Sequence, residues 1–352
     1  MESTPVIRKE TKNRLRVDYE GKLSFKDRLL KKLQSSHTWV MVLIRIARFI
    51  LMLGVSYVIL NPFITKIAGS FMSKEDVIDS TVLLIPKHFT TDIYKYLFLE
   101  NHYMQAFLNT VLLSLMCALF QTFIACCVGY GLAKFKFRGN KIVMAMVIVT
   151  MVIPHSALKL SFMQHFSHFD LFKVIAWDYN GLFALFSGGK TLALTNTFWP
   201  MAILSITGLA FKNGLYIYMM RQFFKGVPDE LEESAYVDGS GVIRTFFQII
   251  LPLSIPMMIT IFLFSFSWQW TDEFYVQMFF TDTLNKTYLM PDVYQSVPTT
   301  LAKTISNFSG KTIYESVIKN TAGLMIIMPL VIVYLFCQRF LVQGIERSGL
   351  VG

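Results

Sequence analysis

Long apolar runs separated by shorter polar stretches form the pattern of this chain. Six of the runs come close to or exceed the roughly 20 residues that a helix needs to cross about 30 Å of hydrocarbon. We therefore expect an all-α, polytopic transmembrane helical protein with six membrane spans, and with residues 39–352 as its transmembrane domain. The spans are expected at residues 40–64, 105–133, 142–160, 198–224, 253–275 and 321–340.

The longest well-patterned polar passage between these runs covers residues 226–256. Near its start, the Asp229 carboxylate is suited to accept hydrogen bonds from the free backbone N–H groups of a helix beginning there. Gly239 is expected to end that helix, because glycine readily adopts the left-handed conformation that other residues resist. A second amphipathic segment, residues 242–251, then leads to Pro252 and the fifth apolar run. The pattern predicts a helix–turn–helix between two spans, suited to docking a soluble partner.

The composition agrees with a membrane protein. The chain is 54% hydrophobic and only 16% charged, which is too apolar for a soluble domain of this length. Its net charge of +10 is concentrated near the N-terminus, since 12 of the 33 Lys and Arg residues precede Phe49. Basic residues beside a span commonly set topology and contact anionic lipid. We therefore expect membrane lipid, and no nucleic acid, as the partner of these charges.

Basic residues also predict which polar segments lie in the cytoplasm. Six spans place both termini on one side, and 21 of the 33 Lys and Arg residues lie on the side of the N-terminal tail. By the positive-inside rule, the basic extension at residues 1–38, the connector at 134–141, the 226–252 passage and the C-terminus are cytoplasmic. Residues 22–35 of the extension allow two alternatives, a short interfacial helix or a disordered tail.

Polar residues at membrane depth are candidates for a substrate pathway. Lys212 and Asn213 lie near the middle of the fourth run, where a charge is costly and usually faces a cavity or a polar partner. They either line the pathway or make a structural contact with another subunit, or the span is shifted so that Lys212 lies nearer the membrane edge. Trp270 and Glu273, next to Trp268, lie at the outer end of the fifth run. They either bind a solute by stacking and hydrogen bonding or form an interfacial aromatic belt with a polar cap.

Other chemical signals are weak. Two Gly-Lys-Thr triplets, at residues 189–191 and 310–312, lack the glycine that a phosphate-binding loop has five residues upstream. His165 and His168 have helical spacing for a metal, but no acid or cysteine completes the set. Four cysteines lie in apolar runs and are expected to be buried thiols. We expect no catalytic residue, no metal site and no cofactor in this chain.

The 226–252 passage resembles the EAA loop of permeases from binding-protein-dependent ABC importers. The matching text is Glu-Ser-Ala, Asp-Gly and, twelve residues after that glycine, Leu-Pro, with Ser234 replacing the middle alanine of the motif. Three other stretches are similar to carbohydrate importer permeases: residues 109–110, 129–140 and 338–352. Within that family the chain looks most like the six-span, maltose-type subunit.

The resemblance implies the fold of a type I ABC importer permease and a heteromeric complex. It implies a sister permease, two copies of a cytoplasmic ABC ATPase that bind ATP and magnesium, and an extracellular solute-binding protein that delivers a carbohydrate. Glu233 would pair with a basic residue of the ATPase, and Gly239 would let the chain turn close to it. The residues implied in ATPase coupling are Glu233, Ser234, Ala235, Asp238, Gly239, Leu251 and Pro252.

The expected function is that of a permease subunit of an ATP-driven carbohydrate importer in the cell membrane. An oligosaccharide substrate follows from the resemblance alone, so a permease for another solute class is an alternative. A stand-alone secondary transporter is a second alternative. Such a protein usually shows repeated halves and a set of functional intramembrane charges, whereas this chain shows no convincing internal repeat and Lys212 as its single deep charge.

Overall fold

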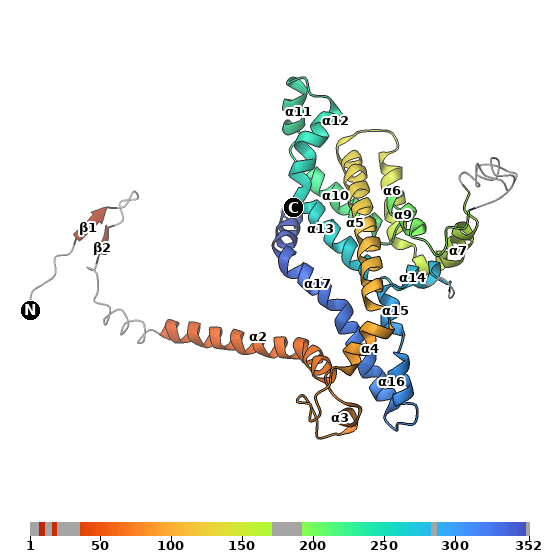
Figure 1. Ribbon diagram of the computed structural model, residues 1–352. Helices are drawn as coiled ribbons and strands as arrows, with labels where there is room; N and C mark the ends of the chain where they lie inside the picture. Colours follow the sequence, from red (N-terminus) through yellow and green to blue (C-terminus); the bar gives the residue numbers. More distant parts are fainter. Residues whose placement is uncertain (1–6, 11–15, 20–35, 171–191, 283–286, 350–352) are drawn as a thin grey trace, which may run out of the picture. The chain divides into compact units, whose positions relative to one another are not determined.

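The computed structural model describes residues 7–10, 16–19, 36–170, 192–282 and 287–349 (Figure 1). The chain forms two compact units, residues 1–65 and 66–352. Residues 22–35, where an interfacial helix was one alternative, lie outside the described ranges.

The first unit contains a short antiparallel hairpin and the start of a long helix. Strands β1 (Ile7–Glu10) and β2 (Arg16–Tyr19) pair with Ile7 opposite Tyr19, a feature that the apolar pattern did not predict. Helix α2 (Ser36–Gly69) begins in this unit and ends in the second. Its apolar part, Trp39–Gly69, is long enough to cross a membrane, which confirms the first predicted span.

Three further helices confirm predicted spans in the second unit. They are α5 (Tyr103–Lys134), α13 (Leu251–Trp270) and α17 (Lys311–Gly349), and α13 continues a helix that starts at Val242. Their apolar residues surround the helix rather than forming one stripe, as expected for helices buried between lipid and protein. Among the described residues, four helices are therefore long and apolar enough to span a membrane.

The third predicted span is not one straight helix. Helix α6 (Asn140–Val152) ends before Pro154 and is followed by the turn η1 (His155–Leu158) and α7 (Lys159–Ser167), with a bend of 91° between the two parts. Proline lacks the N–H that would continue the helix and disfavours helical geometry in the residue before it. Counted as one bent span, this pair raises the number of candidate spans to five.

The fourth predicted span is also interrupted, so the expectation of one helix over residues 198–224 is wrong. Helix α9 (Trp199–Ile206) ends at a six-residue break, and α10 (Asn213–Lys225) begins after it. Gly208 and Lys212 within the break both have positive φ angles, of 77° and 69°. Two left-handed residues cannot be part of a right-handed helix, and hydropathy alone does not detect them.

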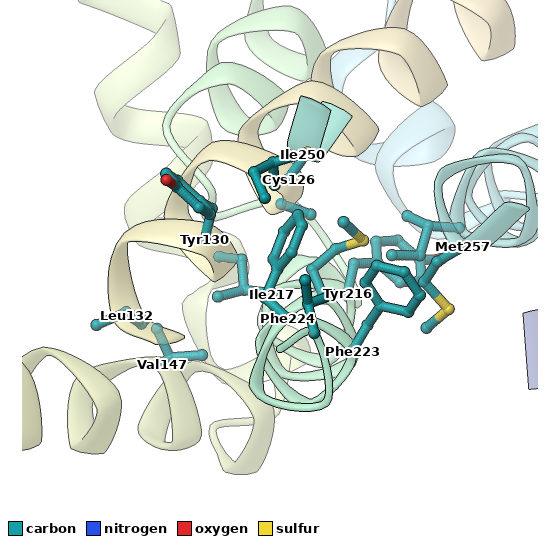
Figure 2. Packing of buried hydrophobic residues seen from close by; sticks show 14 of the residues in the cluster. Cys126, Tyr130, Leu132, Val147, Tyr216, Ile217, Phe223, Phe224, Ile250 and Met257 are labelled. Atoms are coloured by element: carbon teal, nitrogen blue, oxygen red, sulfur yellow. The ribbon is translucent and has the colours of Figure 1, made fainter. Parts of the chain in front are cut away.

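Helix α5 is the central helix of the second unit and packs against α10 and α13. Figure 2 shows one of the buried clusters around it, in which Tyr130 of α5 lies near Phe224 of α10. The α5–α10 crossing is close at Gly129, where an added Cβ would lie 2.6 Å from the Met220 Cβ. Only glycine allows the two backbones to approach this closely.

Short helices lie toward both ends of the second unit (Figure 1). At one end, α11 (Glu230–Val237) and α12 (Val242–Thr245) form a hairpin, and the π-turn η2 (Phe246–Ile250) joins α12 to α13. The remaining short helices are α3 (Lys74–Ile78), α4 (Asp92–Glu100), α14 (Phe274–Phe279), α15 (Met290–Gln295) and α16 (Thr299–Thr304).

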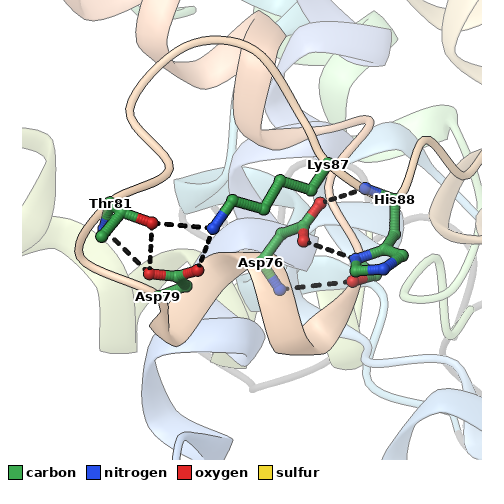
Figure 3. A network of polar contacts seen from close by, with 6 residues as sticks. Asp76, Asp79, Thr81, Lys87 and His88 are labelled. Carbon is green, nitrogen blue, oxygen red and sulfur yellow. Dashed lines mark hydrogen bonds and ion pairs between the residues drawn. The ribbon is translucent and has the colours of Figure 1, made fainter.

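A polar network fixes the loop that follows α2 (Figure 3). The buried Asp76 carboxylate accepts hydrogen bonds from the His88 backbone N–H at 2.7 Å and pairs with the His88 ring at 2.8 Å. Lys87 donates to Asp79 at 2.6 Å and to Thr81 at 2.8 Å. The two acid–base pairs close residues 76–88 into a compact loop.

Candidate functional site

The turn between α11 and α12 has the predicted glycine geometry. Gly239 has a φ angle of 81°, and its N–H donates to the Tyr236 carbonyl at 3.0 Å. The Ser240 N–H donates to the Ala235 carbonyl at 2.9 Å, which completes a Schellman motif at the end of α11. Ser240 then contacts the Thr245 hydroxyl at 3.0 Å. These bonds reverse the chain within a few residues and confirm the predicted helix–turn–helix.

The sequence predicts that Asp229 caps the start of α11, but the structure holds this helix start in another way. Asp229 precedes the helix but makes no side-chain cap. Its carboxylate instead accepts a hydrogen bond from the Lys134 ammonium at 2.5 Å, and the same ammonium donates to the Val227 carbonyl at 2.6 Å. These bonds from Lys134, together with its charge, hold the pKa of Asp229 below its ordinary value. A clamp from the end of α5 therefore replaces the expected cap.

Sequence reasoning missed the role of Lys134 in this clamp. In the sequence, Lys134 is one of several basic residues of the 134–141 connector and part of the 129–140 stretch that resembles importer permeases. Its partner lies 95 positions away, so no local pattern could have paired the two. The available signal was a lysine in the last turn of an otherwise apolar span, where only its ammonium needs a polar partner.

The inner face of α11 packs against its own chain. Ala235 is 6% exposed and Glu232 is 8% exposed. The burial of Ala235 gives its small size a reason within this chain. Burial raises the pKa of Glu232, against the opposing attraction of Lys134. Both Glu232 and the nearby Tyr130 side chain are thus buried at the inner face of α11.

The outer face of the hairpin combines acidic and apolar side chains. Glu233, Ser234 and Asp238 are exposed, and the Ser234 hydroxyl donates to the Glu230 carbonyl at 2.7 Å. Val237 is 88% exposed and Ile243 is 75% exposed. Exposed apolar residues grouped with polar ones mark interaction sites. We define the hairpin surface as the exposed residues Leu231, Glu233, Ser234, Val237, Asp238, Ile243 and Phe247.

The second arm of the hairpin is continuous with α13. Residues Val242–Trp270 form one helical segment in which the Leu251 N–H donates to the Phe246 carbonyl across the π-turn η2. Pro252 lies in the first turn of α13, where its missing N–H is tolerated without a break. The expected separate amphipathic segment is thus the end of the fifth span, so a force on α12 acts directly on α13.

Lys212 and Asn213 lie at the break between α9 and α10. Asn213 is fully buried and its side-chain amide donates to the Ser205 carbonyl at 3.1 Å, which links the two helices across the break. The Lys212 ammonium lies 4.7 Å from the centre of the Phe211 ring and 4.9 Å from that of Trp268. These distances are typical of cation–π contacts. Asn213 thus serves the fold, whereas the ammonium lies among aromatic rings.

Trp270 and Glu273 differ in exposure: the first is buried and the second is exposed. Trp270 is 1% exposed, and its indole N–H donates to the Ile326 carbonyl at 2.9 Å. Its ring contacts those of Phe107 and Phe266, so no face is open to a ligand. Glu273 is exposed and accepts hydrogen bonds from two glutamine side chains. Of the two tryptophans at the end of α13, Trp268 is the accessible one, with 50% of its surface exposed.

Two cavities meet at Phe211, which lines both. The first has a volume of about 220 Å³ and the second of about 180 Å³. Besides Phe211, the first is lined by Gln121, Ser265, Trp268, Gln269, Thr271, Asp272, Glu273, Phe274 and Tyr275. The second is lined by Thr150, Met151, Val152, Ile153, Pro154, His155, Lys212, Gly214 and Leu215. The two helix breaks, at Pro154 and Lys212, thus border one hollow region.

Other predicted chemistry can be placed in the described part of the chain. No group of three or more His, Cys, Asp or Glu residues there could hold a metal ion. Gly310 of the second Gly-Lys-Thr triplet contacts Ile78 so closely that a Cβ would lie 2.3 Å from its Cγ2 atom, so the glycine serves packing. The triplet at residues 189–191 lies outside the described residues. Cys117 and Cys126 are buried as expected, but Cys127 and Cys337 are only partly buried.

Comparison with known proteins points in one direction. The family described as "Binding-protein-dependent transport system inner membrane component" matches residues 121–347. The chain is 26% identical to the galactooligosaccharides transport system permease protein GanQ of Bacillus subtilis over 86% of this chain and 94% of that protein. It is 26% identical to the maltodextrin transport system permease protein MalD of Streptococcus pneumoniae over 86% of this chain and 93% of that protein.

A solved structure shows a similar fold. It is the crystal structure of a bacterial ABC transporter involved in the import of the acidic polysaccharide alginate. One of its chains aligns with a TM-score of 0.64 and 18% identity, over 90% of this chain and 98% of the other. At this identity the likeness supports the architecture of the helices and no more.

Proposed function

The chain belongs to the family of inner membrane components of binding-protein-dependent transport systems, and we propose that it is the permease subunit of an ATP-driven oligosaccharide importer. Several apolar helices and the family place it in the plasma membrane as a multi-pass protein. The oligosaccharide names of its relatives GanQ and MalD support the substrate class. The observation that carries the proposal is the exposed hairpin surface on a helix continuous with a membrane span.

Six crossings follow when each broken pair is taken as one span. The two broken pairs, α6–α7 and α9–α10, are then the third and fourth crossings, between α5 and α13. This arrangement puts both termini and the hairpin in the cytoplasm, in line with the distribution of basic residues. The two helix breaks lie where the chain lines cavities, which is where a bilayer protein tolerates irregular backbone.

Coupling to a separate ATPase would use the hairpin surface. Glu233 and Asp238 offer carboxylates to basic residues of the ATPase, and Val237 and Ile243 offer apolar contact. When two ATPase subunits close around ATP and magnesium, each docked hairpin is displaced. The continuous helix through Leu251 and Pro252 passes this motion to α13, and the Lys134 clamp passes it to α5. The transport step is the resulting movement of the spans against a sister permease.

The hollow region at Phe211 would form this subunit's part of the sugar pathway. Lys212, Trp268 and Glu273 reach it, and a solute-binding protein would deliver the sugar from outside. Trp270 is excluded from direct contact by its burial. Asn213 supports the wall by closing the break rather than by reaching the sugar.

The test is purification of the tagged chain from native membranes in mild detergent, with identification of everything retained. We expect a second permease and an ABC ATPase to copurify. Ile243→Asp should release the ATPase and keep the sister permease, because it places a charge in the apolar part of the docking surface. Ile85→Asp is the matched control, since Ile85 is 84% exposed in the loop after α2. A chain that purifies alone and moves sugar without ATP would instead be a secondary transporter.

A further inference from the structure

Lys212 is held in a backbone conformation that lysine rarely adopts. Its φ angle is 69°, and it stands directly before the first turn of α10. For a residue with a Cβ, left-handed geometry brings that atom too close to the following carbonyl oxygen. The break fixes it there, because the Asn213 N–H donates to the Ala210 carbonyl and the Lys212 carbonyl accepts from Tyr216. Such strain is concentrated at ligand sites.

The Lys212 charge is not neutralised by a nearby carboxylate. Within the described ranges no Asp or Glu oxygen lies within 4.0 Å of its ammonium, which lies over the rings of Phe211 and Trp268. The two carboxylates of the adjoining cavity have other partners. Asp272 accepts the N–H groups of the turn that starts α14, and Glu273 accepts from two glutamines. A cation at membrane depth normally faces a partner or a cavity, so its counter-charge is to be sought in the cavity.

The walls around Lys212 suit a sugar. Trp268 presents a half-exposed indole beside the ammonium, and aromatic rings pack well against the apolar faces of pyranoses. Side-chain amides and hydroxyls of Gln121, Ser265, Gln269 and Thr271 line the adjoining cavity. A few polar groups beside aromatic walls are typical of a small-molecule site.

We propose that this region recognises an acidic oligosaccharide, with a sugar carboxylate paired to the Lys212 ammonium and a sugar ring stacked on Trp268. This rests on the proposed function and narrows its substrate class. A charge-assisted pair of this kind is stronger than a hydrogen bond between neutral groups. A neutral sugar would leave the ammonium without an anionic partner, so the site favours uronic acid units over their neutral counterparts.

The experiment uses the assembled importer, with its ATPase and solute-binding protein, in liposomes that contain ATP. Uptake of a galacturonic acid trimer is compared with uptake of the matched neutral galactose trimer. Lys212→Met should lower uptake of the acidic trimer by about tenfold or more, whereas Lys212→Arg should keep most of it. Lys159→Met is the control, because Lys159 is an exposed lysine that lines neither cavity. Copurification of the ATPase with each variant shows that the complex is assembled.

The outcomes separate this inference from the proposed function. ATP-dependent import of the neutral trimer alone would overturn the acidic substrate and keep the importer. An equal loss of both sugars in Lys212→Met would also overturn it, by assigning Lys212 to packing or to the sister permease. Failure of the wild-type complex to import any sugar with ATP would overturn both.

Discussion

The continuous helices and the broken helices of this protein differ in their packing and in what they border. Helices α5 and α13 cross without interruption, pack closely, and connect to the hairpin surface through Lys134 and η2. The pairs α6–α7 and α9–α10 are interrupted, and both breaks border the second cavity. The first cavity shares Phe211 with it and is otherwise lined mainly by α13 and the residues that follow α13. Within the break, the N–H groups of Leu209 and Ala210 both donate to the Leu204 carbonyl. The bilayer therefore permits a break only where the protein satisfies the freed groups.

The largest effect is expected where the continuous helix α5 crosses α10, the second half of a broken pair. Gly129→Ala would place a Cβ 2.6 Å from the Met220 Cβ and 3.0 Å from the Arg221 backbone nitrogen. Because a backbone atom cannot move aside, the variant should lose about 1–3 kcal/mol of stability. Thermal unfolding in detergent measures the loss.

Gly131→Ala is the control for this contact. It lies in the same helix, and its nearest neighbour to an added Cβ is Phe135 at 4.0 Å. Alanine is the better helix former, so Gly131→Ala should be neutral or slightly stabilising. Equal behaviour of the two variants would show that the α5–α10 crossing is looser than described.

The second prediction tests the connection from α5 to the hairpin. Lys134→Met keeps the apolar stem but removes the ammonium that binds Asp229 and the Val227 carbonyl. We expect ATP hydrolysis by the assembled complex to continue while transport per ATP falls on the order of tenfold, as loss of charge-assisted bonds allows. Simultaneous assays of phosphate release and sugar uptake measure this ratio. Lys136→Met, at an exposed lysine nearby, should leave it unchanged.

The sequence predicted the continuous helices well and the breaks poorly. Hydropathy counts apolar residues over a window, so it located α5 and α13 within a few residues. It averaged over Pro154 and over residues 207–212, where single backbone conformations decide the outcome. Pro154 was a visible signal for the first break. The left-handed conformation of Lys212 had no signal in its own residue type, because lysine does not favour it.

The candidate site shows the same division between local and distant information. The glycine turn at Gly239 depends on neighbouring residues, and the sequence predicted it. The Asp229 carboxylate was expected to cap α11, but it accepts a hydrogen bond from Lys134, which lies 95 residues away. Trp268 and Trp270 are two residues apart, and contacts with α5 and α17 decide that Trp270 is the buried one. Contacts between distant segments therefore set which candidates are accessible.

The third prediction isolates the strain in the broken helices. Lys212→Gly and Lys212→Met both remove the ammonium, but only glycine adopts a φ angle of 69° without steric cost. The glycine variant should be more stable than the methionine variant by about 1 kcal/mol. Comparison of their thermal unfolding measures this difference. Equal stability of the two would remove the argument from strain, since the site would then tolerate a Cβ freely.

The smallest effect is expected outside the spans, in the loop at residues 76–88 that the two acid–base pairs close. Burial alone would raise the pKa of Asp76, but hydrogen bonds from His88 hold that pKa below its ordinary value. Hydrogen bonds from Lys87 and Thr81 likewise lower the pKa of Asp79. A lowered pKa means that each carboxylate stabilises the loop above the unfolded value of about 4. This contribution is lost as the pH falls through the folded values.

Hydrogen exchange at residues 82–87, corrected for the intrinsic rate at each pH, checks this sign. Protection should be constant from pH 8 to about pH 5 and fall only below about pH 4. Asp79→Asn should give a small part of that loss at neutral pH, because it removes the partner of Lys87. Asp92→Asn, at an exposed carboxylate outside this network, should leave protection at neutral pH unchanged. Loss of protection already near pH 6 would contradict the assignment, since neither carboxylate would then have the lowered pKa that its hydrogen bonds require.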